Sequence, residues 1–322
     1  MKHVLITGGC GFIGSNLILH LINNSNDMWF VNYDKLTYAG DLSNLDSVKL
    51  NGRYTFVKGD ICNAQQVEYT IQQYGIDSII HLAAESHVDN SIEDPLQFVT
   101  TNVNGTGVLL EAFRKYCTGR FHYVSTDEVY GTLGDTGMFT EDTPVAPNSP
   151  YSASKASGGL MVRSYQRTYG IDTVITSCSN NFGPHQHVEK LIPTVVKTAL
   201  TGGNIPVYGD GKNIRDWLYV LDHCRAIELV FRKGLTGETY NIGGDHEMSN
   251  IDLVSKICGL LDRLRPKQDG MSYKQQITFV TDRKGHDYRY AVDCNKLKTE
   301  LGWSSSANFD ELLESTIKYY ID

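Results

Sequence analysis

The sequence lacks the features of a membrane-spanning or disulfide-bonded protein. Its 322 residues contain no uninterrupted apolar run of about 20, the length that a helix needs to cross a bilayer. The seven cysteines are scattered, odd in number and without a C-x-x-C pair, so we expect neither a disulfide framework nor a metal site. The expectations are no membrane contact and a cytoplasmic location, where free thiols stay reduced.

Basic charge is also scarce. The sequence has 29 lysines and arginines against 37 aspartates and glutamates, which gives a formal net charge of -8. Nucleic acid is not expected as a partner, because its binding needs a basic surface. The chain has no internal repeats or low-complexity tracts, and its length suits one large α/β domain or one domain with a smaller appendage.

Short apolar segments rich in β-branched residues alternate with helical patterns in the first half of the chain. Such alternation is typical of parallel strands joined by right-handed helical crossovers. The sequence therefore predicts an α/β fold: a Rossmann-type doubly wound parallel sheet with a smaller C-terminal α/β region that binds substrate. The expected strands are residues 3–6, 29–33, 54–57, 78–82, 121–124 and 173–176, and the expected helices are residues 95–116, 151–169, 189–200, 222–231, 251–261 and 309–320.

We divide the chain into a dinucleotide-binding domain, residues 1–176, and a mainly substrate-binding region, residues 177–322, some of whose segments return to the sheet. Residues 265–273 read as a surface loop. The helices expected at 95–116 and 151–169 are long enough to expose one face and bury another. They form either an interface between two copies of the chain, which makes a homodimer, or ordinary core packing.

Glycines mark a cofactor site near the N-terminus. Residues 7–14 read TGGCGFIG, directly after the first expected strand. Gly8 and Gly11 permit a tight turn against a pyrophosphate, which the helix N-terminus attracts, and Gly14 permits close helix packing. The expected pyrophosphate site is Gly8, Gly11, Phe12, Ile13 and Gly14.

Two aspartates at strand ends extend this site. Asp34 ends the second expected strand, where a carboxylate accepts hydrogen bonds from the adenosine ribose and repels a 2′-phosphate, which favours NAD over NADP. Asp60 and Ile61 follow the third strand and are expected to frame the adenine. The alternative for each aspartate is an ordinary turn residue.

Two further motifs point to hydride and proton transfer. Tyr151 and Lys155 are four residues apart in an expected helix, so both share one face, where the ammonium can lower the pKa of the phenol and make it a base. Asp127 and Glu128, at the end of a buried strand, add two proton-transfer groups that a simple alcohol dehydrogenase does not need. The alternatives are a helical surface pair for the first motif and helix-start residues for the second.

With these motifs in place, the chain resembles the extended short-chain dehydrogenase/reductases, and among them the sugar-nucleotide 4,6-dehydratases. The resemblance spans nearly the whole chain. Besides the glycine loop and the Tyr-Lys motif, it rests on residues 34–40 (DKLTYAG), 81–89 (HLAAESHVD), 125–131 (STDEVYG), 179–181 (SNN), 189–193 (EKLIP), 214–217 (IRDW) and 285–287 (GHD).

The resemblance implies an NAD-dependent lyase, in which oxidation at carbon 4 of a nucleotide-linked glucose makes the carbon 5 proton acidic. Tyr151 is then the base for the 4-hydroxyl, assisted by Lys155, and Thr126 helps to hold that hydroxyl. Glu128 removes the carbon 5 proton, and Asp127 protonates the departing 6-hydroxyl. The 4-keto-6-deoxy product serves deoxysugar biosynthesis, for example that of rhamnose.

The resemblance also implies ligand contacts along the chain. His187 and His223 lie outside them and are interpreted as ordinary solvated or core histidines. For NAD the contacts are, besides the glycine loop and the residues around the two aspartates, Lys35, Leu36, Thr37, Leu82, Ala83, Ala84, Thr101, Tyr151, Lys155 and Asn181. For the sugar nucleotide they are Ser86, Thr126, Asn180, Glu189, Lys190, Leu191, Arg215, Asn250, Arg283 and His286.

The nucleotide and the reaction class each keep an alternative. Asn90, Phe182, Lys284 and residues 185–188 depart from the family pattern, and thymine differs from uracil by one methyl, worth only about 1 kcal/mol. The expected substrate is dTDP-glucose, with UDP-glucose as the alternative. A sugar-nucleotide 4-epimerase lacks the Asp-Glu pair and a non-enzymatic NAD-binding regulator is expected to lose the Tyr or the Lys, so both are remote alternatives.

Overall fold

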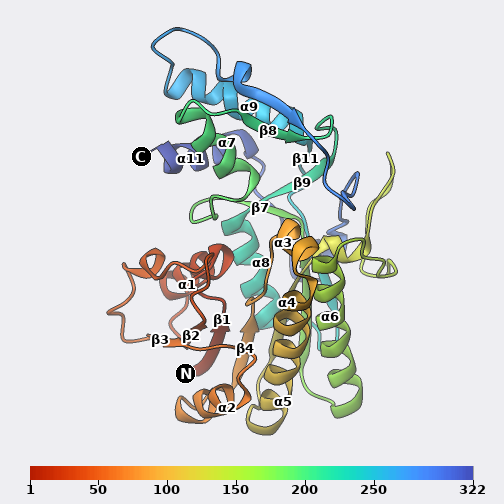
Figure 1. The fold of residues 1–322 in the computed structure, drawn as a ribbon. Helices are drawn as coiled ribbons and strands as arrows, with labels where there is room; N and C mark the ends of the chain where they lie inside the picture. Colours follow the sequence, from red (N-terminus) through yellow and green to blue (C-terminus); the bar gives the residue numbers. More distant parts are fainter. Residues whose placement is uncertain (322) are drawn as a thin grey trace.

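A seven-stranded parallel sheet forms the centre of the computed structural model, which describes residues 1–321 (Figure 1). The strand order is β10-β6-β5-β4-β1-β2-β3, and all neighbouring strands are parallel. The order changes direction between β1 and β4, and doubly wound sheets bind ligands at such a switch point. The strands are β1 (Lys2–Thr7), β2 (Met28–Asp34), β3 (Tyr54–Lys58), β4 (Ser78–His81), β5 (Phe121–Thr126), β6 (Thr173–Cys178) and β10 (Thr239–Ile242).

Helices cover both faces of this sheet. Along β1, Val4 and Ile6 point into the core beneath α1 and α8, while Leu5 between them points into the core beneath α2, α5 and α6. Both faces are therefore dry, which suits strands that read as continuous apolar runs. The helices are α1 (Phe12–Asn24) and α8 (Val220–Lys233) on one face, and α2 (Ala64–Gln73), α5 (Thr106–Tyr116) and α6 (Pro150–Tyr169) on the other.

The C-terminal region builds a second hydrophobic core beyond the carboxyl ends of the sheet strands (Figure 1). Fully buried Val195, Leu253, Ile257 and Leu313 join its three main helices. Its elements are β7 (Asn180–Phe182), β9 (Ile214–Tyr219) and β11 (Glu247–Ser249) in one sheet, the parallel pair β8 (Ile205–Tyr208) and β12 (Ile277–Val280), and the helices α7 (Leu191–Leu200), α9 (Asn250–Leu264), α10 (Asn295–Leu301) and α11 (Phe309–Ile321).

The sequence-based elements agree closely with this fold. All six expected strands are present, and their ends differ from the expected ones by at most two residues. The helix expected at 95–116 spans these residues but changes form: α4 (Pro95–Phe98) passes into a π-helical segment, η2 (Val99–Gly105), before α5. The parallel pair β8 and β12 and the helix α10 were not expected, because their apolar patterns are only a few residues long.

The second half of the chain also contributes to the central sheet. β10 pairs with β6, and α8 packs beside α1, although both follow residue 176 in the sequence. Segments after residue 176 thus return to the sheet, as expected. The division of the chain at residue 176 into a cofactor-binding and a substrate-binding part stays a prediction. Within residues 1–321, no helix is both long and apolar enough to cross a bilayer.

Candidate active site

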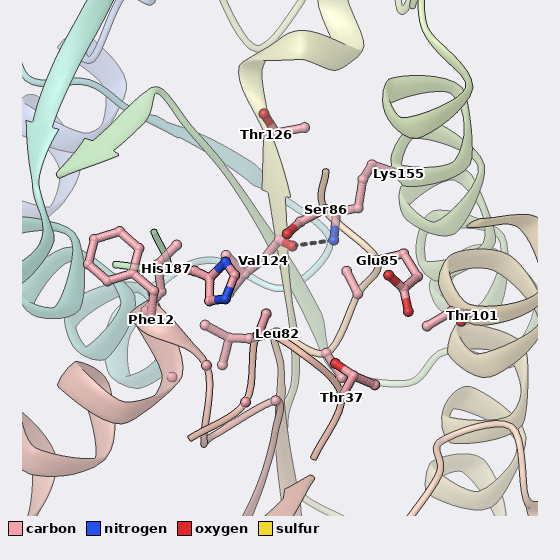
Figure 2. A pocket seen from close by; sticks show the side chains of 18 of the residues that line it. Phe12, Thr37, Leu82, Glu85, Ser86, Thr101, Val124, Thr126, Lys155 and His187 are labelled. Carbon is pink, nitrogen blue, oxygen red and sulfur yellow. Dashed lines mark hydrogen bonds between the residues drawn. The ribbon is translucent and has the colours of Figure 1, made fainter. Parts of the chain in front are cut away.

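A cavity of about 320 Å³ opens at the carboxyl ends of the central strands, where the C-terminal region covers the sheet. Figure 2 shows Phe12 and His187 on one side of it, with Glu85 and Thr101 on the other. The predicted site residues that line this cavity are Gly8, Gly11, Phe12, Ile13, Gly14, Asp34, Lys35, Thr37, Asp60, Ile61, Leu82, Ala83, Ala84, Ser86, Thr101, Thr126, Asp127, Glu128, Tyr151, Lys155, Asn180, Asn181, Glu189 and Lys190.

The loop after β1 presents backbone rather than side chains to the cavity. Gly8 has a φ of +72°, and a Cβ there would lie 2.7 Å from the backbone nitrogen of Ala83. A Cβ on Gly14 would lie 2.1 Å from the carbonyl oxygen of Gly8, so both positions require glycine. Within the described chain, α1 has no side-chain cap at its N-terminus, and its first N–H groups are left for a bound anion.

Gly14→Ala tests this loop. The variant is expected to bind NAD at least about tenfold more weakly and to lose about 1–3 kcal/mol of stability, because the new methyl must displace the Gly8 carbonyl. Calorimetric titration with NAD and thermal unfolding measure the two effects. Gly52→Ala is the control, since a Cβ there meets no described atom within 4 Å. Unchanged NAD affinity in Gly14→Ala would show that the cofactor does not use this turn.

Asp34 sits at the end of β2 with its carboxylate held in place. It is 8 % exposed and accepts hydrogen bonds from the backbone N–H groups of Cys10, at 2.9 Å, and Leu36, at 2.8 Å. The carboxylate thus caps a turn and lines the cavity, so the two interpretations of Asp34 are compatible. Nearby, Lys35 Nζ lies 2.8 Å from Asp60 Oδ2.

These observations fit NAD. The uncapped start of α1 and the glycine turn offer backbone N–H groups to a pyrophosphate. Asp34 retains free lone pairs for ribose hydroxyls, and its charge opposes a 2′-phosphate. The same cavity extends to the ends of β4 and β5, where the other predicted residues lie.

β5 delivers the three residues expected for catalysis. Thr126 ends the strand, and Asp127 and Glu128 begin the 3-10 helix η3 (Asp127–Tyr130). The Thr126 hydroxyl accepts a hydrogen bond from the Glu128 N–H at 3.4 Å and donates to Asp127 Oδ1 at 3.3 Å. Asp127 is only 1 % exposed, and its Oδ2 has no hydrogen-bond partner within residues 1–321. Thr126, Asp127 and Glu128 do stand at the start of a helix, as the alternative interpretation proposed. A helix cap, however, does not require a carboxyl group as deeply buried as that of Asp127.

Burial and neighbouring charges separate the two carboxyl groups. Burial, Glu128 and Asp216 raise the pKa of Asp127 well above its ordinary value. Burial also raises the pKa of Glu128, but the positive charges of Arg215 and Lys190 oppose this rise. Asp127 is therefore suited to hold a proton at neutral pH as a general acid, while Glu128 is the better candidate for an ionised base.

α6 brings Tyr151 to the same part of the cavity. A capping box of Ser149 and Ser152, with Pro150 in the first turn, starts the helix immediately before it. The half-buried Tyr151 ring lines the cavity, and its centroid lies 6.3 Å from that of the Phe98 ring. The capped helix start thus fixes the backbone from which Tyr151 enters the cavity wall.

The prediction that Lys155 lowers the pKa of Tyr151 is wrong when only the groups of the protein itself act on the phenol. Burial and Glu128 raise the pKa of Tyr151 well above its ordinary value. Lys155 Nζ donates to the carbonyl oxygen of Val124 at 2.8 Å (Figure 2) and lies 4.3 Å from the centre of the Tyr123 ring. Burial lowers the pKa of Lys155 to about 8. Ionisation of Tyr151 therefore needs another positive charge.

Polar groups from the C-terminal region close the cavity opposite the glycine loop. Asn180 Oδ1 and Glu189 Oε1 are buried and have no hydrogen-bond partner within residues 1–321. Lys190 Nζ donates to the carbonyl oxygen of Ser86 at 2.9 Å. Buried polar atoms are normally paired, so the unpaired ones here are candidate contacts for a polar ligand.

Six predicted residues are not among those lining the cavity of the described chain. Arg215 is buried and donates to the carbonyl oxygens of Ile214, at 2.7 Å, and Asp287, at 2.9 Å. It nevertheless lies close enough to oppose the rise in the pKa of Glu128, as does Arg283. Their roles stay predictions. The six are Leu36, which follows β2, Leu191 at the start of α7, Arg215 on β9, Asn250 at the start of α9, and Arg283 and His286 after β12.

Sequence reasoning missed several residues of the cavity wall. Glu85 is half-buried, and burial raises the pKa of its carboxyl. His187 lines the cavity, and its interpretation as an ordinary histidine stays a prediction. His223 is a fully buried core histidine whose Nδ1 donates to Asn181 Oδ1 at 2.9 Å. Glu85 lies within a family motif, which was the available signal. The residues missed are Tyr33, Ala39, Gly40, Gly59, Glu85, Val124, Ser125, Cys178, Ser179, Gln186 and His187.

The π-helical segment η2 supports this wall from behind. Asn102, 1 % exposed, accepts from the Glu85 N–H at 2.9 Å and donates to the Glu85 carbonyl at 3.0 Å. It also donates to Ser154 Oγ at 2.8 Å, and Ser154 in turn donates to the Tyr151 carbonyl at 2.7 Å. One side chain within the π-helical segment thereby holds both the loop after β4 and the start of α6.

Comparison with known proteins finds similar sequences among the sugar-nucleotide dehydratases. The GDP-mannose 4,6 dehydratase family profile matches residues 5–316. A dTDP-glucose 4,6-dehydratase of Xanthomonas campestris is 52 % identical over 326 residues, which cover 98 % of this chain and 92 % of that protein.

Solved structures agree. The dTDP-glucose 4,6-dehydratase of Bacillus anthracis, solved in complex with NAD, has a TM-score of 0.90 at 44 % identity and covers 100 % of this chain and 97 % of its own. That of Streptomyces venezuelae, solved with NAD and TYD bound, has a TM-score of 0.93 at 44 % identity, covering 99 % and 97 %. The chain therefore belongs to the GDP-mannose 4,6-dehydratase family of extended short-chain dehydrogenase/reductases, alongside the dTDP-glucose 4,6-dehydratases.

Proposed function

We propose that this chain is an NAD-dependent hydro-lyase, a dTDP-glucose 4,6-dehydratase, which converts dTDP-glucose into dTDP-4-keto-6-deoxy-glucose and water for deoxysugar biosynthesis. The observation that carries the proposal is the pair of buried Asp127 and cavity-lining Glu128 beside Tyr151, because elimination needs an acid and a base that redox chemistry alone does not need. The similarity to named dTDP-glucose 4,6-dehydratases over nearly the whole chain supports the choice of substrate.

Oxidation at carbon 4 comes first in this mechanism. Tyr151 takes the proton of the 4-hydroxyl, which Thr126 holds by a hydrogen bond. Bound NAD would supply the hydride acceptor for carbon 4 and the hydride source for carbon 6, and its positive charge in the oxidised form would favour the phenolate of Tyr151. Lys155, already fixed to the Val124 carbonyl, borders the same space from the next turn of α6.

Elimination follows from the acidity that the 4-ketone confers on carbon 5. Glu128, kept available as a carboxylate by Arg215 and Lys190, removes the carbon 5 proton. Asp127, whose high pKa keeps it protonated, gives its proton to the 6-hydroxyl as water leaves. As carbon 6 is reduced, Glu128 returns a proton to carbon 5, so the oxygen at carbon 4 stays a ketone. The proton taken up by Tyr151 passes to solvent, and Asp127 regains its proton from solvent. No external reductant is consumed.

In this proposal the C-terminal region binds the nucleotide end of the substrate. Lys190 and Arg215 carry charge suited to the diphosphate, and Arg215 offers a planar fork. Asn180 Oδ1 and Glu189 Oε1 lie at the cavity wall without a hydrogen-bond partner in the described chain, and Lys190 Nζ is 3.8 Å from Glu189 Oε1. Phe182 packs against Tyr219 and Phe309 at centroid distances of 5.5 and 5.3 Å, so its departure from the family pattern affects core packing rather than base choice. Leu191, Asn250 and His286 stay predicted contacts.

The test is incubation of the purified protein with dTDP-glucose, and separately with UDP-glucose, in deuterated water without added reductant. The expected product is two hydrogens and one oxygen lighter than the substrate before exchange, carries a 4-keto group, and has deuterium at carbon 5 by NMR and mass spectrometry. A larger specificity constant with UDP-glucose would change the nucleotide assignment. Inertness of both sugar nucleotides would remove the proposal.

We propose a homodimer, with α5 and α6 facing a second copy, as part of the same assignment. These helices pack side by side at one edge of the molecule (Figure 1), and Leu160 on α6 is 55 % exposed, with Leu96 on nearby α4 73 % exposed. Sedimentation analysis is expected to give a dimer for the protein and a monomer for Leu160→Glu, because a buried charge opposes association. A monomeric unmodified protein would contradict this. The seven free thiols suit a cytoplasmic location.

A further inference from the structure

An ion pair joins the two halves of the chain beside the substrate end of the cavity. Arg283 Nε lies 2.6 Å from Asp89 Oδ1, and Arg283 Nη2 donates to Asp89 Oδ2 at 2.8 Å. Asp89 belongs to the first turn of α3 (Val88–Glu93), which follows the loop of Ser86, and Arg283 follows β12. Both carboxylate oxygens of Asp89 therefore contact the same side of the Arg283 guanidinium, although the two residues are 194 positions apart in the sequence.

A third side chain fixes the same pair. The Tyr208 hydroxyl, at the end of β8, donates to Asp89 Oδ2 at 3.4 Å, and the Arg283 guanidinium carbon lies 5.1 Å from the centre of the Tyr208 ring. The side chains of Arg283 and Asp89 are 22 % and 32 % exposed, so the pair is more shielded than an ordinary surface salt bridge.

The arrangement leaves part of Arg283 free. A guanidinium has five N–H groups, and Asp89 occupies the side formed by Nε and Nη2, so Nη1 and the outer N–H of Nη2 remain for a second anion. Arg283 is also close enough to Lys190 and Glu128 to lower the pKa of the first and to oppose the rise in that of the second. Its charge thus acts on the part of the cavity where the proposed function places the diphosphate.

We propose that Asp89 is a positioning residue for the sugar nucleotide, which holds Arg283 so that its free N–H groups face the diphosphate. The inference rests on the proposed function. Asp89 itself does not touch the substrate in this proposal, and its effect passes through one guanidinium. A long arginine side chain without this anchor must lose rotamer freedom each time substrate binds, which weakens binding without changing the chemical step.

Asp89→Asn is the first variant to measure. It is expected to raise KM for dTDP-glucose about tenfold, to leave kcat within about twofold, and to weaken binding of dTDP in calorimetry by a similar factor. NAD affinity is expected to be unchanged. The matched control is Asp27→Asn, which breaks a comparable pair, Asp27 with Arg232 at 2.8 and 2.9 Å, between the turn before β2 and α8. An unchanged or lowered KM in Asp89→Asn overturns the proposal.

A double-variant comparison separates positioning from a structural role of Asp89 in α3. Arg283→Met alone is expected to weaken dTDP binding, and adding Asp89→Asn to it is expected to change affinity by less than about twofold. An equal further loss in the Arg283→Met background overturns the proposal. If the unmodified protein turns over no sugar nucleotide, the proposed function fails, and the dTDP calorimetry of the same variants still decides the role of Asp89.

Discussion

Glu128→Gln is expected to lower the rate of product formation from dTDP-glucose by about a thousandfold. Glutamine keeps the size of the side chain but cannot accept the carbon 5 proton, and Arg215 and Lys190 then lose the carboxylate whose ionisation they favour. Deuterium incorporation at carbon 5 is expected to fall by a similar factor. NMR of reactions in deuterated water measures both rates, and Glu93→Gln, an exposed glutamate on α3, is the control.

Asp127→Asn makes the assignment of the two carboxyls testable. Glu128 is still present in this variant, so recovered substrate is expected to exchange its carbon 5 hydrogen for deuterium while loss of water is strongly slowed. If Asp127→Asn instead stops exchange and Glu128→Gln preserves it, the acid and the base are the other way round. If both variants keep full activity, Asp127 and Glu128 have no catalytic role and the proposed function loses its main support.

Much of this site was predictable because its chemistry is local in sequence. The glycine turn between a strand and a helix, the aspartate and glutamate after β5, and the tyrosine and lysine one helical turn apart each lie within a few residues. Their common location also follows from topology, since the carboxyl ends of parallel strands meet at one edge of the sheet. The structure places the main members of all three motifs on one cavity.

The features that sequence reasoning missed depend on contacts between distant segments. His187 reaches the cavity from a loop after β7, and only the packing of the C-terminal region shows this. The raised pKa of Tyr151 was missed for a similar reason, because helical spacing describes Lys155 but does not reveal the Val124 carbonyl that holds its ammonium. The pairing of Asp89 with Arg283 likewise has no signal in either segment alone.

Tyr151→Phe is expected to lower product formation from dTDP-glucose by about a thousandfold or more, the largest loss among single replacements near carbon 4. Phenylalanine preserves the ring and its packing near Phe98 but has no oxygen to take the 4-hydroxyl proton. Without the 4-ketone the carbon 5 hydrogen is not acidic. Exchange with deuterated water is therefore expected to disappear together with elimination.

That joint loss distinguishes Tyr151 from the carboxyl pair. Asp127→Asn is expected to keep exchange and Tyr151→Phe to abolish it, so the order of the two chemical stages is read from two variants in one NMR experiment. Tyr69→Phe, which alters an exposed tyrosine of α2, controls for loss of a hydroxyl elsewhere. Exchange at carbon 5 that persists in Tyr151→Phe would mean that another group takes the 4-hydroxyl proton, and Thr126, which lines the same cavity, would be the next residue to replace.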